Sequence, residues 1–240
     1  MHRIDLSPDL IERLRLERGE RLHVLDSLDP KRTAHVVIDL QNGFMEEGAP
    51  VEVPVAREIV PNVNAISRAL RASGGLVVFL RFTTPDDPSS WSAFYARSSP
   101  HTARMHREAF APGSHYWQLW PGLDVEPQDL MVDKQRFGAF IPGTCDLHEI
   151  LQARGIDTLI ITGTLTNCCC ESTARDAMQL DYKVIFVADG NAAVTDAEHN
   201  ATLHNMCFLF ADVMRTPEVL DLVARSAHGA VQSAGEGVIA

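Results

Sequence analysis

The sequence has no long hydrophobic run and little positive charge, and each absence excludes a class of protein. No apolar segment among the 240 residues approaches the ~18 residues that a membrane-spanning helix needs. Lysine and arginine number 21 against 32 aspartate and glutamate residues, so the net charge is −11 at pH 7. A chain without a basic excess cannot neutralise nucleic-acid phosphates or an anionic membrane surface. We therefore expect neither a nucleic acid nor a membrane as a partner.

Cysteines are also few, and their arrangement argues against a disulfide framework. There are five, an odd number, and three of them are consecutive at 168–170. The first ten residues are polar and of mixed charge, unlike a secretory signal peptide. These features predict a protein of the reducing cytoplasm.

What is present is the composition and pattern of one globular α/β domain. Apolar residues make up 45% of the chain, enough for a core of ordinary size. Apolar runs predict strands at 34–40, 76–80, 130–133, 158–162, 183–187 and 211–214. Helical spacing predicts intervening helices at 57–72, 144–154, 168–181 and 196–209. This alternation indicates a doubly wound, Rossmann-like fold of three layers (αβα) around a mostly parallel six-stranded sheet.

Three segments fall outside this regular pattern. Residues 1–30 are predicted to form an arm outside the core, 31–225 the domain, and 226–240 a flexible tail. The stretch 82–128 interrupts the domain and is rich in Pro, Ser, His and aromatic residues. So long an irregular insertion is usually functional, so we interpret it as a pocket wall or subunit interface. Its histidines, His101, His106 and His115, are predicted to be surface or interface residues.

Three strand ends carry chemically capable groups, and the carboxyl ends of parallel strands are where ligands bind in such sheets. Asp39 ends the first strand, where it is either a cap for the turn amides of Asn42 or Gly43 or a general base with a pKa raised by burial. Lys134 ends the third strand, where it is either a solvated charge or a group that holds a thiolate and protonates a leaving nitrogen.

The third strand end leads into the cysteine triplet at 168–170. Thr166 or Asn167 is predicted to cap the following helix, whose dipole and free amides would lower the pKa of a thiol in its first turn. Successive helical residues point about 100° apart, so the three thiols cannot all face one pocket, and spacing alone leaves the nucleophile open. The alternatives are inert buried thiols, a redox reporter and, least favoured, a metal site.

The segments 37–44, 133–140 and 163–177 together resemble the cysteine hydrolases of the isochorismatase-like superfamily, and the resemblance spans about residues 30–220. It is closest to the branch of N-carbamoylsarcosine, ureidoacrylate and biuret hydrolases. The resemblance places the base on Asp39, the lysine on Lys134 and the nucleophile on Cys169. It also implies a cis peptide between Thr164 and Leu165, with the backbone amides of Leu165 and Cys169 as the oxyanion hole.

The activity implied by the resemblance is hydrolysis of a carbon–nitrogen bond in a small amide or ureide through a thioester, without a cofactor. Nicotinamidases of the superfamily hold a metal with Asp and His residues after the second strand, but residues 82–91 contain no histidine. We therefore expect no metal. Vinyl-ether hydrolysis, which needs no thiol, and a non-catalytic role remain the alternatives. A homodimer or homotetramer is implied as well.

Seven residues near these motifs are candidates for substrate binding. Gln41 and Asn42 can bond a ureido group or orient the base, and Arg136 can bind a substrate carboxylate or form a surface ion pair. The remaining candidates are aromatic and would wall a small flat substrate or simply pack in the core: Phe44, Trp91, Phe137 and Phe140.

Overall fold

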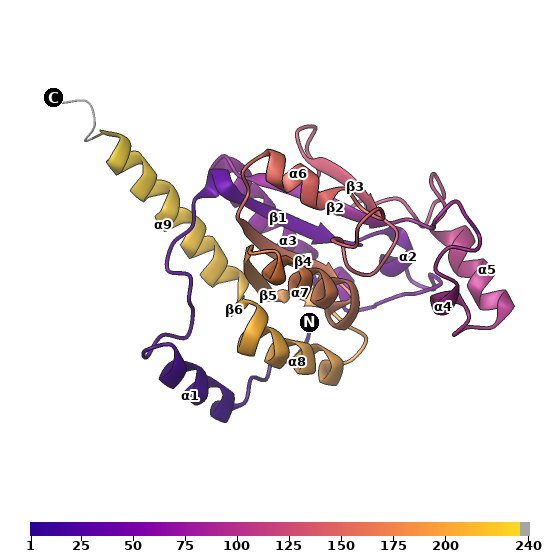
Figure 1. Ribbon diagram of the computed structural model, residues 1–240, viewed down its shortest axis with the longest axis horizontal. Helices are drawn as coiled ribbons and strands as arrows, with labels where there is room; N and C mark the ends of the chain where they lie inside the picture. The colour runs from indigo at the N-terminus through magenta and orange to yellow at the C-terminus, as the bar shows by residue number, and fades with distance from the viewer. Residues whose placement is uncertain (236–240) are drawn as a thin grey trace.

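The computed structural model describes the backbone of residues 1–235 and the side chains of residues 1–226. The described residues form one parallel six-stranded sheet in the order β3-β2-β1-β4-β5-β6 (Figure 1). Its strands are β1 (Thr33–Ile38), β2 (Leu76–Phe82), β3 (Leu130–Lys134), β4 (Thr158–Thr164), β5 (Lys183–Ala192) and β6 (Asp212–Met214). The predicted fold class is confirmed.

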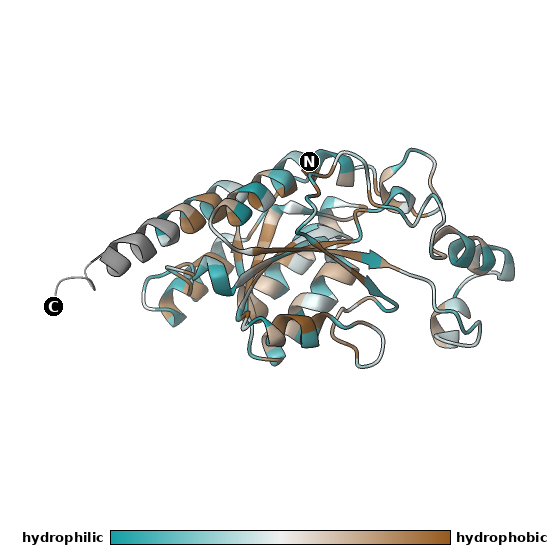
Figure 2. Ribbon diagram, turned by 90° about the horizontal axis from the view of Figure 1, so that it is seen from above, coloured by the Kyte–Doolittle hydropathy of each residue, from teal (hydrophilic) through white to brown (hydrophobic). Residues whose placement is uncertain are grey.

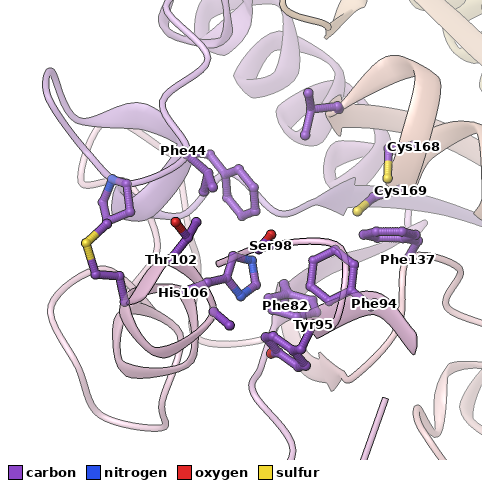
Figure 3. Close-up of a pocket in the computed structure, with 15 residues that line it drawn as sticks. Phe44, Phe82, Phe94, Tyr95, Ser98, Thr102, His106, Phe137, Cys168 and Cys169 are labelled. Atoms are coloured by element: carbon purple, nitrogen blue, oxygen red, sulfur yellow. The ribbon is translucent and has the colours of Figure 1, made fainter. Parts of the chain in front are cut away.

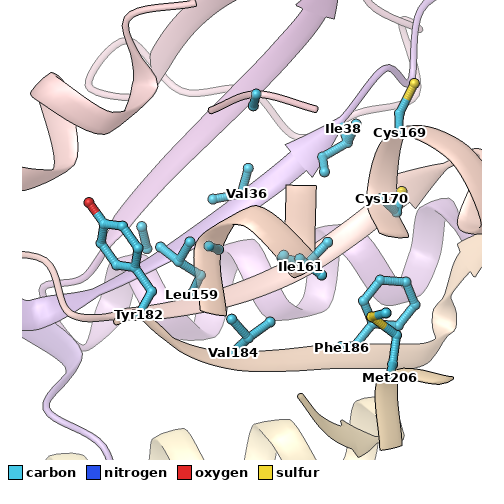
Figure 4. Close-up of a cluster of buried hydrophobic side chains, with 14 of the residues drawn as sticks. Val36, Ile38, Leu159, Ile161, Cys169, Cys170, Tyr182, Val184, Phe186 and Met206 are labelled. Atoms are coloured by element: carbon cyan, nitrogen blue, oxygen red, sulfur yellow. The ribbon is translucent and has the colours of Figure 1, made fainter. Parts of the chain in front are cut away.

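Helices cover both faces of this sheet, as Figure 2 shows from above. One layer contains α3 (Ala56–Ala72) and α9 (Thr216–Gly235), and the other α6 (Leu147–Ala153), α7 (Glu171–Gln179) and α8 (Asp196–Asn205). Side chains of a strand alternate between the faces. Val36 and Ile38 therefore pack beneath the second layer, in the cluster drawn in Figure 4, whereas Val37 packs on the opposite side.

The N-terminal segment and the insertion differ from their predictions. Helix α1 (Pro8–Glu17) buries Leu10 and Leu14 in the same cluster as β1, so this arm belongs to the core. The insertion is not wholly irregular, because it contains α4 (Ser92–Tyr95) and α5 (Pro100–Ala109). Short helical elements also occur at η1 (Pro30–Arg32) and α2 (Asn42–Met45).

Two helix predictions need correction in detail. The predicted helix at 168–181 begins earlier, as the π-helical turn η2 (Thr166–Cys170), before α7. The predicted helix at 196–209 consists of α8 followed by a second π-helical turn, η3 (Met206–Phe210). Helix α9 extends past residue 226, where the tail is predicted to begin, and residues 236–240 lie outside the described part.

The strand order places the candidate residues at one edge of the sheet. The chain leaves β1 for β2 on one side, while β4 pairs with β1 on the other, and ligands bind at such a switch of direction. The α4 and α5 segment lies beyond this carboxyl edge (Figure 1). Among the described residues, no helix is long and apolar enough to cross a membrane.

Candidate active site

The innermost part of the site is an ion pair between Asp39 and Lys134. Lys134 Nζ lies 2.7 Å from Asp39 Oδ2, and both side chains are 0% exposed. Lys134 also donates a 3.0 Å hydrogen bond to the carbonyl of Arg136. Asp39 has a φ of 54°, a left-handed conformation that non-glycine residues rarely adopt and that is concentrated at functional sites.

The turn-capping alternative for Asp39 is not what the structure shows. The amides of Asn42 and Gly43 donate instead to the carbonyls of Gln118 and Tyr116, at 2.8 and 2.9 Å. Burial raises the pKa of Asp39, and the charge and hydrogen bond of Lys134 oppose that rise only in part. The carboxylate is therefore free of the turn and more basic than an exposed aspartate, as the general-base hypothesis requires.

Lys134 is not a solvated charge either. Burial acts to lower its pKa, but the charge and hydrogen bond of Asp39, with a further contribution from Cys169, outweigh burial, so the pKa of Lys134 is raised. A buried ammonium held this way stays protonated at neutral pH. It therefore supplies a fixed positive charge beside the carboxylate and the thiol.

Cys169 is the thiol that the fold brings to this ion pair. It is 3% exposed, and Asp39 and Lys134 are the two charged side chains that act on its pKa. Cys168 shares a hydrogen bond with it, and this bond raises the pKa of Cys169 and lowers that of Cys168. Cys170 is fully buried in the core, where burial raises its pKa well above the ordinary thiol value.

The expectation of a lowered pKa at the triplet is wrong for Cys169. Besides Cys168, burial and the negative charge of Asp39 raise its pKa, and Lys134 only opposes them. The predicted side-chain cap is absent too, because the Thr166 hydroxyl bonds His199 Nδ1 at 2.9 Å and the helix start has no side-chain cap. Cys169 is therefore a neutral thiol beside Asp39 at neutral pH.

A cavity of about 240 Å³ opens in front of the thiol (Figure 3). Cys168, Cys169 and Leu165 form one side of it, and residues of α4, α5 and the intervening loop form another. The insertion is therefore part of the cavity wall. The predicted cis peptide between Thr164 and Leu165 is present, at the point where β4 ends beside the cavity.

The structure brings only two of the seven candidate substrate residues to this cavity, Phe44 and Phe137. Trp91 does not line the cavity and packs edge-to-face against Phe137, with the ring centres 4.7 Å apart. Phe140 packs in the core, with its ring centre 5.7 Å from that of Tyr182. Arg136 donates to the Gln135 carbonyl and to Ser90 and is not among the cavity residues.

The two amide side chains among those candidates contact backbone. Gln41 donates to the carbonyls of Phe82 and Trp117 and accepts from the Phe82 amide, so it fastens the insertion to the end of β2. Asn42 donates to the His115 carbonyl. For Gln41, Asn42, Trp91, Arg136 and Phe140, direct contact with a substrate stays a prediction.

Sequence reasoning missed several residues of the cavity wall, and His106 is the histidine among them. It was expected at a surface or interface, but it is half-buried and lines the cavity. The usable signal was local spacing: Thr102, His106 and Phe110 follow one another at intervals of four, as one face of a helix. His101 is exposed as expected, and His115 is an exposed partner of Glu46.

Comparison with known proteins places this site in a family. The model of the isochorismatase domain matches residues 33–218. The uncharacterized isochorismatase family protein YecD of Escherichia coli O157:H7 is 33% identical, over 81% of this chain and 97% of its own length. The ureidoacrylate amidohydrolase RutB of Caulobacter vibrioides is 27% identical, over 84% of this chain and 96% of its own length. Among solved structures, a cysteine hydrolase from Pseudomonas syringae superimposes with a TM-score of 0.77 and 29% sequence identity. The match covers 85% of this chain and 98% of the hydrolase.

The fold, the matched domain and these similarities agree. The chain belongs to the isochorismatase family, which is a family of hydrolases, and the resemblance drawn from the three sequence motifs is confirmed. Among the residues with described side chains, no group of three or more His, Cys, Asp or Glu side chains is placed to hold a metal ion.

Proposed function

We propose that this protein is an amidohydrolase that cleaves a carbon–nitrogen bond of a small amide, ureido or carbamoyl compound through a thioester on Cys169. The observation that carries the proposal is the contact of the Cys169 thiol with the buried Asp39–Lys134 pair at the wall of a cavity. Similarity to an amidohydrolase supports the same bond class.

The first half of the reaction forms the thioester. Asp39 takes the proton of the Cys169 thiol as the sulfur attacks the substrate carbonyl, so the proton moves between two groups already in contact. Lys134 remains positive and balances the negative charge that passes from Asp39 to the sulfur. The backbone amides of Leu165 and Cys169 hold the developing oxyanion.

The leaving nitrogen receives its proton from Asp39 rather than from Lys134. The raised pKa of Lys134 makes it a poor acid at neutral pH. Asp39, with a raised pKa, is the better matched donor. The amine then leaves, a water attacks the thioester with Asp39 again as base, and the free thiol is restored.

Ammonia release from a panel of small amides and ureides tests the proposal. Turnover is measured for the natural protein, Cys169→Ser and Asp39→Asn, with Cys207→Ala as the control for loss of a buried thiol far from the cavity. We expect both site variants to lose at least about 1,000-fold in kcat and the control to lose little. Full turnover by Cys169→Ser would exclude the thioester mechanism.

A homodimer or homotetramer also remains a proposal, supported by the family resemblance. Sedimentation equilibrium of the purified protein tests it, and a monomer mass at micromolar concentration would exclude both assemblies.

A further inference from the structure

The cavity in front of Cys169 is built almost wholly from apolar groups. Its wall contains four phenylalanine rings from separate segments, which we call the aromatic cage: Phe44, Phe82, Phe94 and Phe137. Their packing is direct, with the ring centres of Phe94 and Phe137 5.3 Å apart in an edge-to-face arrangement. At about 240 Å³ the cavity is smaller than the ~300–1,000 Å³ typical of drug-sized sites, so it suits roughly one ring with an amide.

No charged side chain faces this cavity among the described residues that line it. Two arginines stack on aromatic rings of this region, but neither lines the cavity. Arg107 stacks 3.5 Å from the Tyr95 ring centre, and Arg136 lies 5.1 Å from that of Trp91. Asp39 and Lys134, behind the thiol, neutralise each other. A carboxylate entering the cavity would therefore lose its water without gaining a counter-charge.

His106 is the one imidazole in the cavity wall, and it lies among aromatic rings. Its ring centre is 5.3 Å from that of Phe82 and 5.5 Å from that of Phe94. Figure 3 draws it on the other side of the cavity from Cys168 and Cys169. Neither of its nitrogens has a hydrogen-bond partner within the described part of the chain, and Nδ1 is fully buried.

An unpaired imidazole in such a place needs a partner from outside the chain. Nδ1 is fully buried, whereas Nε2 is not, so Nε2 is the nitrogen that a ligand group in the cavity can reach and bond. Burial, with a smaller effect of the Arg107 charge, lowers the pKa of His106 to about 4, so the ring is neutral at pH 7. A neutral imidazole offers one donor and one acceptor, which fits an uncharged polar group and gives no charge attraction to a carboxylate.

We propose that the substrate is an uncharged, flat amide or ureide whose apolar body fills the aromatic cage, and that His106 determines specificity by bonding a polar substituent far from the scissile bond. This inference rests on the proposed function for the identity of the reacting bond. It separates this chain from hydrolases of carboxylate-bearing ureides, because the cavity supplies no cation for a carboxylate.

Equilibrium binding to the Cys169→Ser variant tests the inference without requiring turnover. Phenylurea and 4-ureidobenzoate share the reacting group and differ only in the carboxylate. We expect phenylurea to bind at least about 50-fold more tightly, as an unpaired buried charge implies. Equal affinities, a preference for 4-ureidobenzoate, or no binding of phenylurea at millimolar concentration would overturn the proposal.

The role of His106 is tested with 3- and 4-hydroxyphenylurea in the same background. We expect one of the two to bind about 5- to 10-fold more tightly than phenylurea, the gain from one hydrogen bond. His106→Phe should remove that gain but keep affinity for phenylurea, which also reports that the cavity is folded. His106→Gln should restore part of it. The matched control is His101→Phe, on the same helix but exposed.

The results distinguish this inference from the proposed function. A hydroxyl preference that survives in His106→Phe, or the absence of such a preference in the natural cavity, would refute the role of His106. Turnover of 4-ureidobenzoate but not phenylurea by the natural protein would refute the substrate class while leaving the amidohydrolase mechanism intact. Tight binding of phenylurea with no thiol-dependent ammonia release from any amide would refute the mechanism alone.

Discussion

Replacing Lys134 by methionine removes one partner of the buried ion pair and leaves the Asp39 carboxylate without a counter-charge. Both side chains are 0% exposed, so no water replaces the lost contact. Breaking a buried pair in this way typically costs about 3–5 kcal/mol. That is a large part of the roughly 5–15 kcal/mol that stabilises an ordinary domain, so we expect a clear loss of the free energy of unfolding at neutral pH.

The loss should depend on pH, and its sign follows from Asp39. Burial already raises the pKa of Asp39, and without Lys134 the opposing charge and hydrogen bond are gone, so the pKa rises further. A carboxyl whose folded pKa exceeds its unfolded value of about 3.9 remains protonated in the folded state while the unfolded state ionises. The contribution of this carboxyl group to the free energy of unfolding is fully present below pH 4, and it falls as the pH rises toward the folded pKa. The cost of Lys134→Met should therefore be small near pH 4–5 and largest at pH 7–8.

Urea unfolding of the natural protein, Lys134→Met and Asp39→Asn/Lys134→Met at pH 5 and pH 8 measures this effect. The double variant has no buried charge, so it should be more stable than Lys134→Met at pH 8 and show less pH dependence. A loss for Lys134→Met below about 1 kcal/mol at pH 8, or one equal at both pH values, would refute the reasoning.

Three further predictions concern the base, the sheet edge and the cavity. Because burial raises the pKa of Asp39, kcat/KM should fall on the acid side with an apparent pKa above 3.8, and a limb at or below 3.8 in a pH–rate profile would contradict this. Gly163→Ala should lower stability by about 2 kcal/mol or more in urea unfolding, since φ is +130° and a Cβ would overlap the Ile38 backbone; a change within 0.5 kcal/mol would contradict it. Met105→Arg places a cation in the cavity wall, where Met105 is 41% exposed, and should tighten binding of 4-ureidobenzoate about 10-fold but not of phenylurea. Unchanged affinity in a titration would weigh against the cavity as the binding site.

The sheet and its chemically capable edge could be predicted from the sequence because both leave local signals. Buried parallel strands have continuous apolar sequences, such as those before Asp39 and Lys134, and residues typical of turns follow each strand. Once the strands are parallel, groups at their carboxyl ends meet at one edge, so the approach of Asp39, Lys134 and Cys169 follows from alternation of strands and helices. The motifs around these residues also indicated the family.

Only the tertiary structure decided what surrounds those groups. The pKa of Cys169 depends on Cys168, burial and Asp39 at short range, and helix position alone predicted the wrong direction. The place of His106 depends on how α5 packs against the end of the sheet, which an insertion without sustained periodicity does not reveal. Charge in the sequence is a sum over the chain, whereas charge in a cavity depends on which side chains face it. The sequence alone therefore determined which groups stand at the strand ends, and folding determined which side chains surround them.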